Sequence, residues 1–325
     1  MSGFGCRKRP ISPEDIELLS SPRDAAARVK GIFNIAITPF GDDGKIDFDA
    51  HAENLDRVID LGYDGVLVGG QYGEFATMTV EERLELSTRT MEIVDKRVPV
   101  MLGAGGSEPA TVRKLVETNG GLGGLPMVTV PYVSEVKDSH IFAYFEQIAP
   151  LSGTGILIYN MPETGHIISP QLLERLADID GIVGVKQGDL TPAVVDRIAG
   201  RLLGKFRVMG ASDLHFLGPL MTGFHGSTST NSSALPELIL KTFRALESGD
   251  AKTATRLHMK WYPLRQLMRE IGQPQTTKAI MTLRGWRGGH ARLPLPDLTA
   301  DQVSRVRDAL KALEVDEESE VAVAA

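Results

Sequence analysis

A lysine ends an apolar stretch of the chain that has the composition of a buried strand. Residues 182–186 read Ile-Val-Gly-Val-Lys. Burying an ammonium group is costly, and a lysine in a desolvated site has a lowered pKa, so Lys186 can be a neutral amine. A neutral amine attacks a ketone and forms a Schiff base. The alternative is that Lys186 has a structural role in a salt bridge at the rim of the fold.

A tyrosine stands at the corresponding place in the preceding apolar run. Residues 156–159 read Ile-Leu-Ile-Tyr, which places Tyr159 at the end of the strand before that of Lys186. Schiff-base formation needs a proton shuttle for the carbinolamine, and a phenol within hydrogen-bond reach can serve. A tyrosine beside the lysine therefore favours chemistry over a salt bridge.

The elements that must position these two residues follow a regular rhythm. Eight short apolar runs alternate with segments that carry helix-start signals such as Thr79-Val-Glu-Glu82, Ser169-Pro170 and Thr191-Pro192. The candidate strands are 32–38, 65–68, 98–102, 127–130, 156–159, 182–186, 206–209 and 226–229. Strands alternating with helices indicate a parallel sheet, and eight units predict a closed (β/α)8 TIM barrel with its active site at the carboxyl ends of the strands.

The two ends of the chain differ from the region between them. We expect an N-terminal arm over 1–29 with a short helix starting at Ser12, the barrel over 30–234, a C-terminal helical extension over 235–313 and a frayed acidic tail over 314–325. The extension predicts three helices, at 235–246, 251–269 and 299–313, and Pro263 should kink or split the second.

Composition excludes several classes of protein. The 325 residues include 42% hydrophobic and 24% charged residues, carry a net charge of −7 and contain one cysteine. The negative charge disfavours nucleic acid and anionic membranes as partners, and a single cysteine excludes an internal disulfide framework. The chain has no apolar run of about 18 residues and no secretory signal, so we expect a cytoplasmic protein without a membrane partner. The seven histidines lack metal-ligand spacing, and we expect no metal site.

Other strand ends offer groups that could hold a substrate. The loop Gly69-Gly-Gln-Tyr-Gly-Glu74 can turn its backbone N–H groups toward an anion such as a carboxylate, although an ordinary tight turn has the same composition. Polar groups, Ser229 among them, follow the eighth strand, where helix capping is an equally good explanation.

Several of these motifs together resemble the dihydrodipicolinate synthase / N-acetylneuraminate lyase family. They are Gly-x-x-Gly-Glu at 70–74, Tyr-Asn-x-Pro at 159–162 and Gly-Val-Lys at 184–186, with Thr38-Pro39-Phe40, Gly103-Ala104-Gly105 and residues 292–296, Arg-Leu-Pro-Leu-Pro, in support. The resemblance covers roughly residues 30–313. It implies class I aldolase-type chemistry on 2-oxo acids such as pyruvate, no metal or organic cofactor, and a homo-oligomer, a tetramer or a dimer. By the motif match, Lys186 is the Schiff-base lysine, Tyr159 is the proton shuttle, and the backbone from Gly70 to Gly73 holds the substrate carboxylate.

The chain also departs from the synthases of that family. They usually carry two threonines where this chain has Gln71 and Tyr72, and a second tyrosine after strand 4, where this chain has Tyr132 followed by Val133. They carry an arginine for the second substrate's carboxylate after Tyr-Asn-x-Pro, and this chain has Glu163 there. A carboxylate ligand would be repelled by Glu163 if its side chain faces the site.

Three functions are consistent with these residues. The first is a Schiff-base lyase, an aldolase or dehydratase for pyruvate or another 2-oxo acid. The second is a family member that binds a keto acid without turning it over. The third is true 4-hydroxy-tetrahydrodipicolinate synthase activity through substitute groups, with the Tyr72 hydroxyl standing in for a lost one. The retention of both Lys186 and Tyr159 favours the first.

Overall fold

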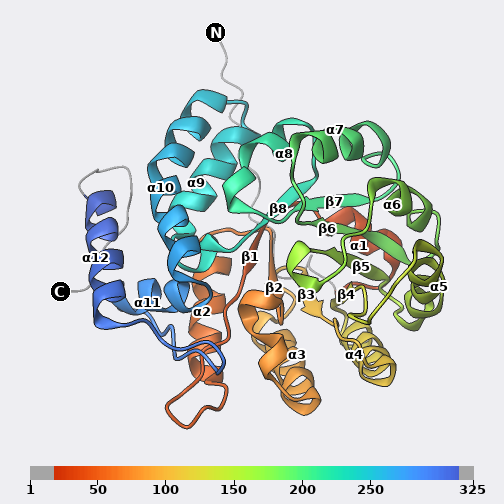
Figure 1. The fold of residues 1–325 in the computed structure, drawn as a ribbon, viewed down its shortest axis with the longest axis horizontal. Coiled ribbons are helices and arrows are strands. Elements are labelled where there is room, and N and C mark those ends of the chain that lie inside the picture. Colours follow the sequence, from red (N-terminus) through yellow and green to blue (C-terminus); the bar gives the residue numbers. More distant parts are fainter. Residues whose placement is uncertain (1–17, 315–325) are drawn as a thin grey trace.

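Eight parallel strands close into a barrel in chain order (Figure 1). The computed structural model describes residues 18–314. The strands are β1 (Gly31–Ile35), β2 (Gly65–Val68), β3 (Val100–Gly103), β4 (Leu125–Thr129), β5 (Ile156–Asn160), β6 (Ile182–Gln187), β7 (Arg207–Gly210) and β8 (Gly226–Ser229). Each overlaps one of the eight runs predicted from the sequence. Because β1 pairs with both β2 and β8, the sheet has no free edge, and the predicted (β/α)8 barrel is confirmed.

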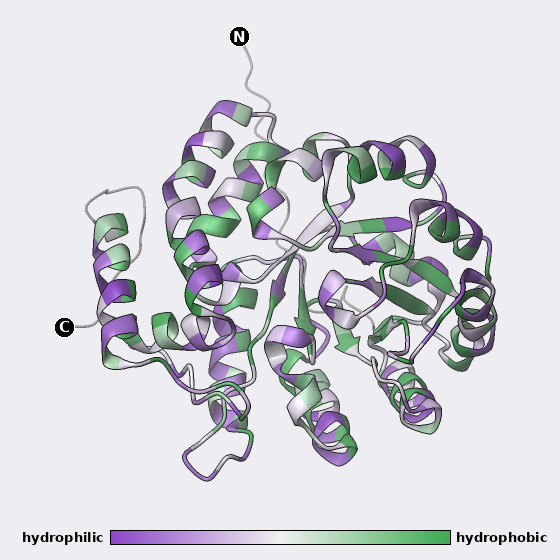
Figure 2. Ribbon diagram, in the orientation of Figure 1, coloured by the Kyte–Doolittle hydropathy of each residue, from purple (hydrophilic) through white to green (hydrophobic). Residues whose placement is uncertain are grey.

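Helices surround the barrel. They are α2 (Phe48–Asp60), α3 (Val80–Val94), α4 (Pro109–Gly121), α5 (Asp138–Ile148), α6 (Pro170–Leu176), α7 (Pro192–Arg201), α8 (Leu217–Met221) and α9 (Pro236–Glu247). In Figure 2 their apolar faces turn toward the strands and their polar faces turn outward. Helix α9 follows β8 and takes the place of the eighth barrel helix, although the sequence analysis placed residues 235–246 in the C-terminal extension.

Local sequence signals explain where several helices begin. Thr79 and Glu82 form the predicted capping box, in which each side chain accepts a hydrogen bond from the backbone N–H of the other residue, at 3.2 and 2.9 Å. The Ser169 hydroxyl caps α6 by accepting from the Leu172 N–H. Thr191 is the N-cap residue of α7, but its hydroxyl makes no capping hydrogen bond.

An N-terminal helix closes one end of the barrel. Helix α1 (Pro22–Arg28) begins after Ser21, whose hydroxyl accepts from the Asp24 N–H. Leu19, Ala25 and Val29 pack into the same apolar cluster as the side chains inside the barrel. This end is opposite the carboxyl ends of the strands, so α1 is a plug beneath the barrel. The helix start predicted at Ser12 lies outside the described residues.

Three helices extend the chain beyond the barrel: α10 (Ala251–Ile271), α11 (Gln275–Leu283) and α12 (Ala300–Glu314). Pro263 was predicted to kink or split this helix. Helix α10 runs on without interruption through Pro263, so the helix is not split, and the kink stays a prediction. Helix α11 was not predicted. In Figure 1, α10 lies beside α9 and α12 stands outermost. Within residues 18–314, no helix combines the length and the apolarity needed to cross a bilayer.

Candidate active site

Lys186 is buried inside the barrel beside Tyr159. The parallel register of β5 and β6 pairs the two residues directly. The Lys186 Nζ lies 4.3 Å from the centroid of the Tyr159 ring and 3.9 Å from the Met161 Sδ. Only 2% of Lys186 is exposed, and no carboxylate of residues 18–314 forms an ion pair with it. The salt-bridge alternative for Lys186 therefore has no partner in the described part of the chain.

The surroundings of Lys186 favour the neutral amine. Burial lowers its pKa from 10.5 to about 7, although the carboxylates of Glu163 and Asp213 favour the charged form and act in the opposite direction. At that pKa roughly half of the amine groups are neutral at pH 7. A lysine in water at this pH would be almost entirely protonated. Lys186 can therefore act as a nucleophile near neutrality.

Tyr159 stays protonated in the same environment. Burial raises the pKa of its phenol, and the charges that Tyr72 and Glu163 can carry raise it further, while the Gln71 N–H has the opposite effect. The Tyr159 Oη lies 3.4 Å from both the backbone nitrogen and the Oε1 of Gln71. The phenol is thus a proton donor placed between Lys186 and the loop that follows β2.

That loop offers backbone N–H groups at the carboxyl end of β2. Its first 3-10 turn is Gln71–Gly73, and its entry requires glycine because Gly69 has a φ of +70° and packs against the Gly103 backbone. The Gln71 N–H points to the Tyr159 oxygen, and the Tyr72 N–H donates no hydrogen bond to residues 18–314. Two adjacent donors beside the Lys186–Tyr159 pair are suited to an anionic oxygen.

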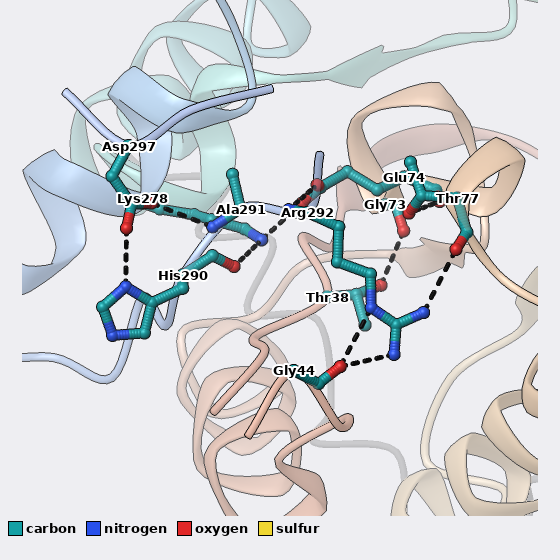
Figure 3. A network of polar contacts seen from close by, with 10 residues as sticks. All are labelled: Thr38, Gly44, Gly73, Glu74, Thr77, Lys278, His290, Ala291, Arg292 and Asp297. Carbon is teal, nitrogen blue, oxygen red and sulfur yellow. Dashed lines mark hydrogen bonds and ion pairs between the residues drawn. The ribbon is translucent and has the colours of Figure 1, made fainter. Parts of the chain in front are cut away.

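A polar network fixes the far side of this loop (Figure 3). The Thr38 hydroxyl donates to the Gly73 carbonyl at 2.8 Å. The Glu74 carboxylate forms an ion pair with Lys278 of α11 and accepts from the Arg292 N–H at 2.8 Å. Glu74 adopts left-handed backbone angles, with φ +58°, which turn its side chain toward α11 and the C-terminal segment. The loop is therefore tied to the segment that follows β1 and to two segments about 200 residues away in the sequence.

An open cleft of about 620 Å³ lies at the carboxyl ends of the strands. Its walls come from the loops after β2, β5, β6, β7 and β8, and from the C-terminal half of α10. Met161 is part of the wall, and because its sulfur contacts the Lys186 Nζ, the lysine lies directly beneath the cleft. Arg265 and Arg269 project from α10 into the same space.

The predicted substrate-binding residues divide into two groups. Gln71, Tyr72 and Glu163 line the cleft, and Gly70 and Gly73 shape the loop that holds the first two. Tyr132 and Ser229 do not line it. Tyr132 is 76% exposed and its ring packs on Gly165, whereas Ser229 is fully buried below the cleft-lining Thr230.

Sequence reasoning missed several residues of this region, most clearly Arg265 and Lys278. Arg265 follows Trp261 at the spacing where the apolar face of α10 continues with Leu264 and Met268, so a charge on that face was a readable signal. Lys278 lies among the buried residues of α11, a helix that was not predicted. Neither residue falls in a motif.

A family model and curated relatives of one kind match most of the chain. A family model described as the dihydrodipicolinate synthetase family matches residues 28–313. The chain is 30% identical over 286 residues to a 4-hydroxy-tetrahydrodipicolinate synthase of Neisseria gonorrhoeae, covering 87% of this chain and 98% of the relative. It is 31% identical over 288 residues to a protein of the same name from Maridesulfovibrio salexigens, with the same coverage.

Solved structures show the same fold. A prophage protein of the dihydrodipicolinic acid synthase family from E. coli, determined in complex with pyruvate, superposes with a TM-score of 0.84 at 26% identity, covering 89% of this chain and 99% of that one. A dihydrodipicolinate synthase of Thermotoga maritima gives a TM-score of 0.82 at 27% identity, with 87% and 97% covered. The likeness spans nearly the whole length of these proteins.

Proposed function

Since the chain belongs to the dihydrodipicolinate synthetase family, we propose that it is a pyruvate-dependent lyase of the aldolase type that forms a Schiff base on Lys186. Family membership supports the lyase. The Schiff base is supported mainly by one observation, a fully buried lysine with a pKa of about 7 that faces a phenol on the neighbouring strand. The pyruvate complex of the E. coli family member also supports a 2-oxo acid ligand.

The reaction begins with attack by the neutral Lys186 amine on the keto carbon of the 2-oxo acid. The resulting carbinolamine loses its hydroxyl as water, with the proton supplied by Tyr159, and leaves a protonated imine. The deprotonated Tyr159 then takes a proton back from the substrate. Its raised pKa suits this role because the phenol returns readily to its protonated state.

The loop after β2 orients the substrate. The Tyr72 N–H, which has no partner among residues 18–314, binds the carboxylate adjacent to the keto group together with the Gln71 N–H. This contact places the keto carbon above Lys186, because the loop, Tyr159 and Lys186 adjoin one another. In a cleavage, the protonated imine accepts the electron pair of the neighbouring C–C bond as that bond breaks, which gives an enamine. In a dehydration, it accepts the electron pair of the adjacent C–H bond as the proton leaves, and the resulting enamine expels the neighbouring hydroxyl, which departs as water after protonation. Reprotonation and hydrolysis of the enamine-derived imine release the keto acid and restore Lys186.

A second candidate, 4-hydroxy-tetrahydrodipicolinate synthase activity, is favoured by the printed names of the curated relatives. Two features weigh against it. The partner of the Tyr159 hydroxyl is the side-chain amide of Gln71, which does not relay a proton as a hydroxyl does. The strand-5 loop presents the Glu163 carboxylate to the cleft, and that charge repels a second carboxylate nearby.

Self-association belongs to the same proposal. Tyr132 and Val133 follow β4 and are 76% and 52% exposed, which is unusual for adjacent large apolar side chains. We propose that they form part of a homo-oligomer interface. Light scattering of the intact protein should give a mass that is a multiple of the 35.2 kDa chain, and a monomer at every concentration would contradict this part of the proposal.

A direct assay of cleavage tests the proposed lyase. A panel of 4-hydroxy-2-oxo acids is supplied, and released pyruvate is measured with lactate dehydrogenase. Wild-type protein should release pyruvate from at least one member, and Lys186→Ala should release none. Activity that survives in Lys186→Ala would contradict the Schiff-base mechanism. Production of 4-hydroxy-tetrahydrodipicolinate from pyruvate and aspartate semialdehyde, with no cleavage of the panel, would favour the second candidate.

A further inference from the structure

We infer that Arg265 and Arg269 form a binding site for a second acidic group, so that the substrate is a 2-oxo acid with another carboxylate at its far end. This inference rests on the proposed function, which assigns the carboxylate next to the keto group to the loop of Gln71 and Tyr72. It specifies the class of substrate that the cleft takes.

The two arginines lie about one turn apart on the same face of α10, four residues from each other, and both line the cleft. Side chains at this spacing on a helix are neighbours, and like charges there repel. An anion held between them removes that repulsion. A planar guanidinium also presents paired N–H donors that match a carboxylate, which a single ammonium group does not.

Arg265 has unused donors although it is buried. It is 5% exposed, and its Nε makes no hydrogen bond within residues 18–314. The carboxylate of Asp213 lies 3.9 Å from this Nε, which is an ion-pair distance but too long for a hydrogen bond. The nearer Asp213 oxygen instead accepts from the Asn231 N–H at 2.9 Å. Asp213 thus compensates the charge of Arg265 and leaves its N–H groups available to a ligand.

Arg269 supplies the uncompensated charge. It is exposed at the rim, and none of the ion pairs among the described residues involves it. Two acids share the cleft, Glu163 and Asp189, but neither forms an ion pair with either arginine in this part of the chain. Asp189 is engaged in capping, since it accepts from the Thr191 N–H at 3.1 Å.

The arginine site and the keto-acid site adjoin each other at Tyr72. Tyr72, Arg265 and Arg269 line the same cleft, and the charges of the two arginines oppose the rise in the pKa of the Tyr72 hydroxyl that burial causes. One ligand can therefore contact the Tyr72 backbone at one end and the arginines at the other. This relationship favours a single extended diacid over two separate ligands.

Matched pairs of acids test the inference. Dissociation constants are measured by calorimetry for 2-oxo diacids of five to seven carbons and for the 2-oxo monoacids of the same chain length. At least one diacid should bind about tenfold more tightly than its monoacid, as a charge-assisted hydrogen bond predicts. Arg269→Gln should abolish the difference. Arg265→Lys, which keeps a charge opposite Asp213 but loses the planar group, should reduce it.

Arg113→Gln is the control, because Arg113 is an exposed arginine of α4 and its replacement changes the net charge equally. Absence of any diacid preference in the wild type, or a preference that survives both α10 substitutions, would overturn the inference. Borohydride trapping of the same acids separates it from the proposed function. If the acids give adducts but diacids bind no more tightly than monoacids, only the arginine site is contradicted. If Arg269→Gln removes a diacid preference in binding but no acid gives an adduct, the arginine site is upheld and the Schiff base is contradicted.

Discussion

The ammonium group of Lys278 and the carboxylate of Glu74 form a buried ion pair across 204 residues of sequence (Figure 3). Lys278 is 2% exposed and Glu74 is 3% exposed. Glu74 ends the loop of Gln71 and Tyr72, so this ion pair connects α11 to the proposed carboxylate site. The stability of the fold and the shape of the site are therefore coupled.

Breaking this pair should lower the stability of the fold. Lys278→Met leaves the Glu74 carboxylate buried without its counterion, which should lower the free energy of unfolding by about 3–5 kcal/mol. The double variant Lys278→Met with Glu74→Gln removes the stranded charge and should recover part of that loss. Urea unfolding of the wild type, the single variant and the double variant measures the loss of stability and its partial recovery. A single variant that unfolds at the wild-type midpoint would show that the pair does not hold the loop.

The pH dependence of imine formation should report the pKa of Lys186. Only the neutral amine is nucleophilic, so the rate should rise with pH through about 7 and level off above it. Glu163 favours the ammonium form, and Glu163→Gln should therefore move the midpoint to lower pH. The measurement is the initial rate of adduct formation with pyruvate from pH 5 to 9. Glu146→Gln, an exposed acid on α5, should leave the midpoint in place. A midpoint that Glu163→Gln raises would contradict the assignment.

Burial of the Lys186 ammonium group should lower the stability of the folded protein. Its pKa is depressed in the folded state, to about 7, relative to its ordinary value of 10.5. The unfolded chain therefore binds more protons between these values, and the cost of burying Lys186 is full below pH 7 and fades as pH rises toward 10.5. Lys186→Met should be more stable than wild type by several kcal/mol at pH 6. Unfolding at pH 6 and pH 9.5 measures this, and an equal difference at both values would exclude the depressed pKa.

Loss of the Tyr159 hydroxyl should slow imine formation much more than loss of the Tyr72 hydroxyl. Tyr159→Phe removes the proposed proton shuttle and should slow imine formation by about 100-fold or more. Tyr72→Phe keeps the backbone N–H that binds the carboxylate and should change the rate only a few-fold. Single-turnover trapping with pyruvate compares the two. If Tyr72→Phe has the larger effect, the Tyr72 hydroxyl is part of the proton relay, as the synthase alternative requires.

The barrel and its central pair could be predicted from the sequence because each depends on local patterns. The apolar runs located all eight strands, and their order placed Lys186 and Tyr159 on neighbouring strands at the carboxyl end. The role of α1 was not predictable in this way. A short helix carries no signal for whether it lies on the surface or, as Leu19 and Ala25 show, plugs the barrel.

The rest of the site depends on contacts between distant segments. Arg265 and Lys278 reach the site because α10 lines the cleft and α11 contacts the loop after β2 through Glu74, and no local pattern fixes that packing. Pro263 does not split α10 for a related reason: tertiary packing on α9 and α12 can maintain a helix through a proline that would break an isolated one. Tyr132 was expected at a strand end like Tyr159, but β4 ends at Thr129, and Tyr132 lies in the loop beyond it, at the surface.

Trapping of the pyruvate adduct tests the central claim most directly. The protein is incubated with pyruvate and borohydride, and the intact mass and the modified peptide are determined for wild type and for Lys186→Ala. The account predicts one reduced pyruvate adduct per chain, located on Lys186, and none on the variant. An adduct on another lysine, or an unmodified wild type that still releases pyruvate from a 4-hydroxy-2-oxo acid, would contradict it.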